Sequence, residues 1–411
     1  MAHLLLFVLV FAAQLIAGFS TQKLPTSHSG SMITILSIDG GGIKGIIPAT
    51  VLNYLDKALK AKDPNADLAH YFDVIGGTST GGLITAMLAA PSPDDPSRAA
   101  FTPAQIVDFY VEDGPHIFNT SNPGDGPIFD GQYLHNITRE LLKDTRLNQT
   151  LTKVVIPTFD LKRQKPVIFS SYKLESAPYL NALLSDICIS TSAAPVYLPP
   201  YYFVNDGVEF NMIDGGAAAG NPTQATVSEV LQHNKYPKIL VLSLGTGTTK
   251  IEEIYDVQMA ATWNLLDWIT KGIGLLGGGS TAMTELYLAS LFLGFQPGNT
   301  YLRIEEYNLD PAFTDMANVT KENLKGLSDT GINLLKEKVV RMNLDTFNFE
   351  DAGEGTNAEA LDRLAEILYE ERQDRLKRKS TERGGRPFLE TLRVPSDKTL
   401  ANWAFLNNIF I

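Results

Sequence analysis

A serine between glycines, in the sequence Gly-Thr-Ser-Thr-Gly at residues 77–81, is the part of the chain best suited to covalent chemistry. An apolar run at residues 71–76 precedes it and a helix-like run at residues 83–90 follows it. A G-x-S-x-G pattern between a strand and a helix predicts a sharp turn that presents the serine hydroxyl at the end of a sheet. Gly77 and Gly81 permit the tight backbone and keep side chains away from a substrate. Ser79 is therefore the candidate nucleophile.

A carboxylate at the end of another predicted strand is the candidate partner of Ser79. Asp214 ends the short apolar run 210–213, and Gly215 and Gly216 follow it. Without a bulky neighbour, this carboxylate can approach a serine on an adjacent strand and accept its proton. An Asx-turn or a helix N-cap explains the local sequence equally well, because the following residues are compatible with a helix.

A histidine base and a metal site both lack support in the sequence. No histidine after the N-terminal segment lies at a glycine-rich strand end, where a catalytic base would be presented. We expect surface roles for His28, His70, His116, His135 and His233. No cluster of metal-ligating residues is visible either, which predicts catalysis without calcium.

A glycine-rich loop, Asp-Gly-Gly-Gly-Ile-Lys-Gly at residues 39–45, follows a predicted buried strand at residues 32–38. Residues 40–45 match the G-x-G-x-x-G of dinucleotide sites, and a nucleotide-dependent oxidoreductase is the alternative class of enzyme. That motif requires an acidic residue at the end of a second strand, about 20 residues further on. Here the interval has the periodicity of a helix at residues 51–60.

The same glycines can serve an esterase. The N–H groups of Gly40, Gly41 and Gly42, at the start of a helix, can bind an anion such as the oxyanion formed when a serine attacks an ester. Lys44 would add positive potential to this loop, and its alternative interpretation is an ordinary surface lysine.

Along the chain, the glycine loop comes first, the serine motif second and the Asp-Gly-Gly at residues 214–216 third. These three motifs, in this order along the chain, resemble those of the patatin-like lipid acyl hydrolases. The segment Ile-Ser-Thr-Ser-Ala-Ala-Pro at residues 189–195 also resembles that family, and the likeness extends from about residue 33 to about residue 403. Within the family, the chain resembles the plant storage-organ patatins, which carry signal peptides. The resemblance implies a Ser-Asp dyad, with Ser79 as nucleophile and Asp214 as proton acceptor. It also implies an oxyanion loop at Gly40, Gly41 and Gly42, with Thr80 adding its N–H. Asp39, Lys44, Gly45, Gly77, Gly81, Gly215 and Gly216 complete the motifs.

The activity implied by the resemblance is hydrolysis of acyl esters of phospholipids and galactolipids. No cofactor, nucleotide or nucleic acid is expected, and the protein would contact membrane surfaces transiently. The family also includes storage and defence proteins, so a non-catalytic vacuolar storage glycoprotein is the second hypothesis. The oligomeric state stays open.

Candidate strands alternate with helices along the chain, which predicts an α/β fold. The strand candidates at residues 153–159, 166–170 and 239–244 are apolar, as in a mostly parallel central sheet covered by helices on both faces. This three-layer arrangement is the patatin-like fold. A single domain is expected over residues 32–411, including a charged C-terminal helix at residues 358–379. The apolar, glycine-interrupted segment 263–295 is predicted to form buried helices, with a mobile cap that contacts lipid as the alternative.

The composition indicates an acidic protein of the secretory pathway. The chain has 411 residues and a net charge of −12, which argues against nucleic-acid binding. The uncharged apolar run at residues 3–18 predicts a signal peptide over about residues 1–20, with a linker at 21–31; a retained anchor is the alternative. The single cysteine, Cys188, excludes an intrachain disulfide and reads as buried. Sequons at Asn119, Asn136, Asn148 and Asn318 predict a glycoprotein of the vacuole or the extracellular space.

Overall fold

The computed structural model describes residues 32–119, 126–234, 238–250, 255–268, 273–294 and 299–384. At its centre is an eight-stranded mixed sheet with the order β5-β6-β3-β2-β1-β7-β8, and β4 pairs with β3. Strands β3, β2, β1, β7 and β8 are parallel, whereas β4, β5 and β6 run antiparallel to their neighbours. The predicted α/β fold with a mostly parallel sheet is confirmed. The strands are β1 (Met32–Ile38), β2 (Val74–Gly77), β3 (Lys153–Asp160), β4 (Lys165–Ser170), β5 (Tyr201–Asn205), β6 (Val208–Asp214), β7 (Lys238–Leu244) and β8 (Thr300–Ile304).

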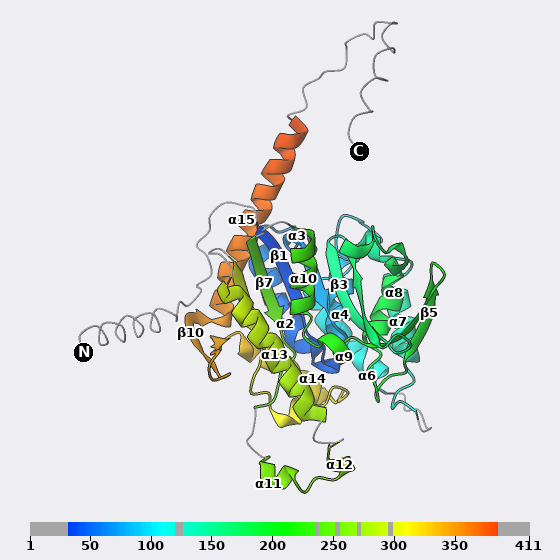
Figure 1. Ribbon diagram of the computed structural model, residues 1–411. Helices are drawn as coiled ribbons and strands as arrows, with labels where there is room; N and C mark the ends of the chain where they lie inside the picture. Colours follow the sequence, from blue (N-terminus) through cyan, green and yellow to red (C-terminus); the bar gives the residue numbers. More distant parts are fainter. Residues whose placement is uncertain are drawn as a thin grey trace, which may run out of the picture.

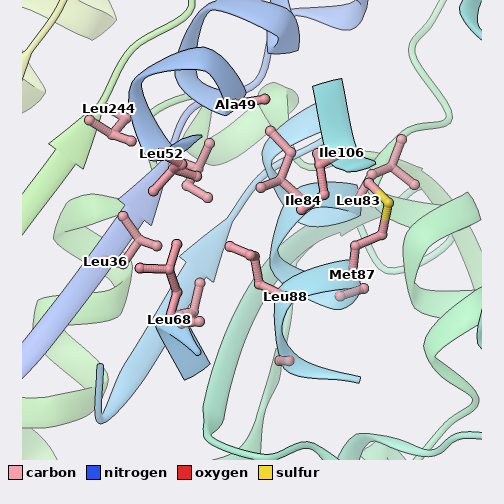
Figure 2. Packing of buried hydrophobic residues seen from close by; sticks show 14 of the residues in the cluster. Leu36, Ala49, Leu52, Leu68, Leu83, Ile84, Met87, Leu88, Ile106 and Leu244 are labelled. Carbon is pink, nitrogen blue, oxygen red and sulfur yellow. The ribbon is translucent and has the colours of Figure 1, made fainter. Parts of the chain in front are cut away.

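Helices cover both faces of this sheet (Figure 1). Successive β1 residues alternate between the two faces, so that Ile35 belongs to one hydrophobic cluster and Leu36 to the other. Figure 2 shows the larger cluster, where Leu36 of β1 lies near Leu52 and Leu88 of two covering helices. The larger cluster is covered by α2 (Ile46–Lys60), α4 (Thr80–Ala89), α5 (Pro103–Glu112), α7 (Gln132–Leu142), α8 (Leu184–Thr191), α14 (Lys321–Leu334) and α15 (Asn357–Gly384). The smaller cluster is covered by α10 (Thr223–His233) and α13 (Ile273–Gly294).

The remaining elements are short. A 3-10 turn spans Gly42–Gly45, and a two-stranded sheet pairs β9 (Lys338–Met342) with β10 (Phe349–Thr356). None of the helices within the described ranges is both long and apolar enough to span a bilayer. The short helices are α3 (Leu68–Tyr71), α6 (Gly114–Ile117), α9 (Gly216–Ala219), α11 (Val257–Ala260) and α12 (Leu265–Asp267).

The start of β2 differs from the prediction. The apolar run from residue 71 was expected to be strand throughout, but Tyr71 ends helix α3 and the strand begins at Val74. Between them, the carboxylate of Asp73 accepts hydrogen bonds from the N–H and hydroxyl of Thr34 and from Arg375. The N–H of Asp73 also donates to the carbonyl oxygen of Thr34 at 2.8 Å, so Asp73 is the residue at which the chain joins β1 before the strand begins.

The register of the sheet places the predicted motifs at one edge. Ile38 and Gly77 are paired, so β1 and β2 end side by side and their following loops meet. Asp214, the last residue of β6, is paired with Thr158 of β3. Because β3 is the other neighbour of β2, the carboxylate and the elbow serine leave the sheet close to each other.

Candidate active site

Ser79 occupies a strained turn between β2 and α4. Its backbone angles, φ 55 and ψ −123, are rare for a residue with a side chain. A Cβ on Gly77 would lie 2.0 Å from the carbonyl oxygen of Gly81, and a Cβ on Gly81 would lie 2.1 Å from that of Ile38. Only glycine fits at both positions, as the G-x-S-x-G pattern predicts for an elbow.

Thr191, the last residue of α8, connects this turn to the central sheet through two hydrogen bonds. Its hydroxyl accepts the N–H of Ser79 at 2.9 Å and donates to the carbonyl oxygen of Pro157 on β3 at 2.7 Å. The sequence places Thr191 inside a family-like segment but assigns it no role. A buried hydroxyl with one acceptor and one donor bond fixes the elbow relative to the sheet.

Asp214 lies beside Ser79 with its carboxylate buried. Both residues line the same cavity, and the side chain of Ser79 acts on the carboxylate of Asp214, whose Oδ1 also accepts the N–H of Gly216 at 2.6 Å. The turn that the sequence offers as one interpretation of this aspartate is therefore present, because Oδ1 closes the turn that opens α9, while the catalytic interpretation stays a prediction. Burial raises the pKa of Asp214 to about 6, although its hydrogen bonds to Ser79 and Gly216 act to lower it. A carboxylate with this pKa is a better base than an ordinary aspartate.

The glycine loop runs directly beside the serine. A Cβ on Gly40 would lie 3.2 Å from Cβ of Ser79. The N–H of Gly40, however, donates to the carbonyl oxygen of Gly220 at 3.0 Å. This bond corrects the expectation that all three glycines present N–H groups to an oxyanion: Gly40 provides the close approach, and its N–H is already used.

Gly41 and Gly42 are the remaining N–H donors of the loop. Neither N–H is hydrogen-bonded to another group in the part of the chain that the structure describes. Thr80 is the first residue of α4, where N–H groups lack a partner inside the helix. A Cβ on Gly41 would lie 2.4 Å from Oγ1 of Thr246, which itself donates to the carbonyl oxygen of Gly40 at 2.7 Å. Thr246, which the sequence does not indicate, therefore fixes the shape of the loop.

A buried ionic cluster lies behind the loop. Arg303 of β8 bonds Asp39 and Glu305 at 2.7 Å each and contacts Glu285 of α13 at 3.3 Å. Burial raises the pKa of Asp39 and of Glu285, and raises that of Glu305 to about 7, while Arg303 acts in the opposite direction. The ion pair with Arg303 thus holds Asp39, the first residue of the loop, to strand β8 of the sheet.

Lys44 is not an ordinary surface lysine. Its ammonium group donates to the carbonyl oxygen of Gly247 at 3.2 Å, and its side chain lines the cavity described below. Burial lowers the pKa of Lys44, and the nearby charge of Glu305 partly opposes this effect.

These groups open into a cavity of about 570 Å³, within the size range of small-molecule sites. Ser79, Asp214, Gly41 and Gly42 lie on its wall. The larger part of the wall is apolar and comes from α4, α5, α6, α7 and the segment after α8. Its apolar residues are Leu83, Tyr110, Ile117, Phe118, Leu134, Pro195, Tyr197 and Leu198.

Comparison with known proteins identifies the family of this chain. The family model described as "Patatin-like phospholipase" matches residues 36–227, a range that includes the glycine loop, Ser79 and Asp214. The chain is 44% identical over 387 residues to "Patatin-like protein 2" of Arabidopsis thaliana, which covers 84% of this chain and 93% of that protein. It is 42% identical over 382 residues to "Patatin-17" of Solanum cardiophyllum, covering 88% and 96% respectively. The chain belongs to the patatin-like phospholipase family.

In this patatin-like protein the described histidines are not part of the cavity wall that contains the serine. None of His70, His116, His135 and His233 is among the residues that line the cavity. His135 packs against Tyr201, and the ring of His233 stacks on Tyr172 while its Nδ1 is bonded to the carbonyl oxygen of Glu229. His28 lies outside the described residues. No group of three or more potential metal ligands occurs within the described ranges.

Proposed function

We propose that this protein hydrolyses acyl esters of phospholipids and galactolipids through an acyl-enzyme on Ser79, with Asp214 as the base. Membership of the family supports lipid acyl hydrolase activity in general. The observation that carries the mechanism is that Ser79 and the buried carboxylate of Asp214 lie together at the wall of an apolar cavity. The apolar wall suits a fatty acyl chain, whose burial would supply binding energy.

In the first half-reaction, Asp214 takes the proton of Ser79 while the serine oxygen forms a bond to the acyl carbon. The carbonyl oxygen becomes negatively charged, and in this proposal the N–H groups of Gly41, Gly42 and Thr80 stabilise it. The bond to the alcohol then breaks, and the departing oxygen takes the proton from Asp214. The lyso-lipid leaves and the acyl group remains on Ser79.

In the second half-reaction, water gives a proton to Asp214 and its oxygen attacks the acyl carbon. The bond between the acyl carbon and the serine oxygen breaks, the serine regains a proton from Asp214, and the fatty acid is released. The balance of this sequence requires no metal, nucleotide or redox partner, and activity in the presence of a chelator of divalent cations is expected.

The test is hydrolysis of phospholipid, galactolipid and neutral-lipid substrates by matched variants. Ser79→Ala is expected to abolish release of fatty acid, and Asp214→Asn to lower kcat by about 100-fold or more. Ser190→Ala is the control, because Ser190 is another buried serine of the same region, bonded to the carbonyl oxygen of Asp186. A serine-directed phosphonate is expected to label Ser79 alone. Activity retained by Ser79→Ala would refute the nucleophile, and a histidine variant equally inactive would replace the dyad with a triad.

The second hypothesis, a non-catalytic storage glycoprotein of the vacuole, is separated by the same assay. It predicts no hydrolysis of any of the three lipid classes by the wild type, together with high abundance in a storage organ. A defence role is compatible with the enzyme. Tight, saturable binding of NAD without ester hydrolysis would instead support a nucleotide-dependent enzyme.

A further inference from the structure

The most exposed apolar side chains of the described structure include a group on the connection between β7 and α13. We name residues 255–268, which contain α11 and α12, the α11–α12 segment. Figure 1 shows it apart from the body of the domain, on the side toward which β7 points. Leu265 is 77% exposed and Val257 is 74% exposed, which are high values for aliphatic side chains. Met259, Trp268 and Tyr255 are exposed as well.

The aromatic residues of the segment form a small cluster of their own. The ring of Trp263 lies edge-on to those of Tyr255 and Trp268, with centroids 5.0 Å apart in both pairs. Exposed aromatic and aliphatic residues gathered in one segment mark an interaction site rather than the scattered apolar residues of an ordinary surface. Tryptophan and tyrosine in particular favour the interface between lipid and water.

Residues of the cavity wall flank the segment along the chain on both sides. Before it, the chain leaves β7 through Thr246, Gly247 and Thr248, all of which line the cavity. After it, α13 contributes Thr281 to the same wall. A lipid surface held by the α11–α12 segment would therefore bind a part of the chain that is continuous in sequence with two portions of the cavity wall.

The charge of the segment selects the kind of surface. Residues 255–268 contain Asp256 and Asp267 but no lysine or arginine, and the whole chain has a net charge of −12. Attraction to anionic lipid, which relies on basic residues, is therefore absent from this segment. Apolar insertion into an electrically neutral lipid surface fits these residues.

We propose that the α11–α12 segment inserts its exposed apolar side chains into the surface of a bilayer of neutral lipids, zwitterionic or glycosylated, and so docks the cavity on its substrate. The inference rests on the proposed function for its biological meaning, but the docking itself is measurable without catalysis. Binding is expected to need no anionic lipid and to be nearly independent of salt, because burial of apolar area drives it.

The test uses a double variant that combines Leu265→Ser and Trp268→Ser. A matched double variant is its control. The control is Tyr202→Ser with Val204→Ser on β5, at the opposite edge of the sheet, where both side chains are also exposed. Each pair is introduced into the full-length protein carrying Ser79→Ala, and sedimentation with phosphatidylcholine vesicles is measured with and without anionic phosphatidylglycerol. The Leu265/Trp268 pair is expected to weaken vesicle binding by about ten-fold or more, and the control pair to leave it unchanged.

The same pairs in the active enzyme separate docking from chemistry. The Leu265/Trp268 pair is expected to slow hydrolysis of vesicle lipid while a short water-soluble ester is cleaved at the wild-type rate. A second pair, Val257→Ser with Met259→Ser on α11, repeats the test without disturbing the contact of Trp268 with Trp263. Failure of the wild type to cleave the soluble ester would refute the proposed function alone. Undiminished vesicle binding by both α11–α12 pairs would overturn the docking proposal. A change of oligomeric mass in these variants, with vesicle binding intact, would also overturn it, because it would show that a second copy of the chain covers the segment.

Discussion

The hydroxyl of Thr191 lies 2.9 Å from the backbone nitrogen of Ser79, and it donates in turn to Pro157 of β3. This single side chain therefore connects the end of α8, the central sheet and the nucleophile elbow. Ser79 has a positive φ, a conformation that persists only where surrounding contacts hold it. The same stretch of chain also holds the base, because the N–H of Asp214 donates to the carbonyl oxygen of Ala193 at 3.0 Å.

Thr191→Val is expected to impair catalysis without changing the volume of the cavity. Valine has nearly the same shape but leaves the N–H of Ser79 and the carbonyl oxygen of Pro157 without their bonds, at a cost of about 1 to 3 kcal/mol in stability. We expect kcat on a short ester to fall while KM changes little, and Thr191→Ser to restore most of the rate. Thr138→Val is the control, because that hydroxyl bonds only carbonyls of its own helix, of Leu134 and His135. Equal kcat in Thr191→Val and wild type would contradict the bracing role.

The pH dependence of the reaction is set by Asp214. Its carboxylate must be ionised to accept the proton of Ser79, and burial raises its pKa to about 6. We therefore expect kcat/KM for a short ester to rise with pH, with an apparent pKa near 6, and to level off at neutral pH. A pH profile that is flat down to pH 4.5 would disagree with a buried aspartate as the base.

The same carboxylate couples folding to pH. Because the pKa of Asp214 is raised from 3.8, the folded state binds its proton more tightly than the unfolded state, and this contribution to stability is lost as the pH rises through about 6. The gap between the two pKa values corresponds to about 3 kcal/mol. Asp214→Asn removes this titration, so its stability relative to wild type should increase between pH 4 and pH 7. Urea unfolding of both proteins across this range measures the difference, which must grow with pH for the assignment to stand.

Gly41→Ala is expected to damage the oxyanion loop. The added Cβ would lie 2.4 Å from Oγ1 and 2.7 Å from Cβ of Thr246, so the loop or Thr246 must move. Displacement of one N–H donor from an oxyanion typically costs about 3 to 4 kcal/mol in the transition state. We expect a lower kcat with a small change in KM. Gly294→Ala is the control, since no atom of the described residues lies within 4 Å of its Cβ position, and equal loss of activity in both variants would point to a general loss of folding.

Arg303→Met is expected to destabilise the fold strongly, and more so at high pH. The variant leaves Asp39, Glu285 and Glu305 buried together without a compensating charge, for which about 3 to 5 kcal/mol is typical. Without the arginine these carboxylates must hold protons to stay buried, so the loss should be greater at pH 8 than at pH 5. Lys162→Met, which breaks the exposed pair with Glu209, should change stability little at either pH, because solvent screens exposed ion pairs. Denaturant unfolding at the two pH values checks both expectations.

Secretory entry predicts cleavage near residues 18–21 and glycan on at least one sequon. The side chains of Asn119, Asn136 and Asn148 are exposed, whereas Asn318 is half-buried and its amide oxygen accepts bonds from the N–H and hydroxyl of Thr320. We therefore expect occupancy at the three exposed sites rather than at Asn318. Mass spectrometry of the native protein tests this, and an N-terminus at Met1 with four bare asparagines would contradict a vacuolar or extracellular location.

The sequence by itself determined the elements that depend on local pattern. The apolar run Met32–Ile38 is β1 with the predicted bounds, and the strand that ends in Asp214 is β6. The glycine spacing around Ser79 predicted the elbow, because a turn between strand and helix imposes its steric demands on neighbours in the chain. Cys188 is fully buried in α8, as its apolar neighbours indicated.

Tertiary structure decided what depends on residues far apart in the chain. Thr191 meets Ser79 across 112 positions and Arg303 meets Asp39 across 264, and no local pattern encodes either pairing. The N–H of Gly40 does not serve the oxyanion, because it donates to the carbonyl oxygen of Gly220 from another loop. Segment 263–295 divides in the same way: Leu288 and Phe292 are buried by the sheet, while Leu265 and Trp268 extend into solvent. Apolar composition is the same in both cases, and only the position of the packed sheet determines which side chains it covers.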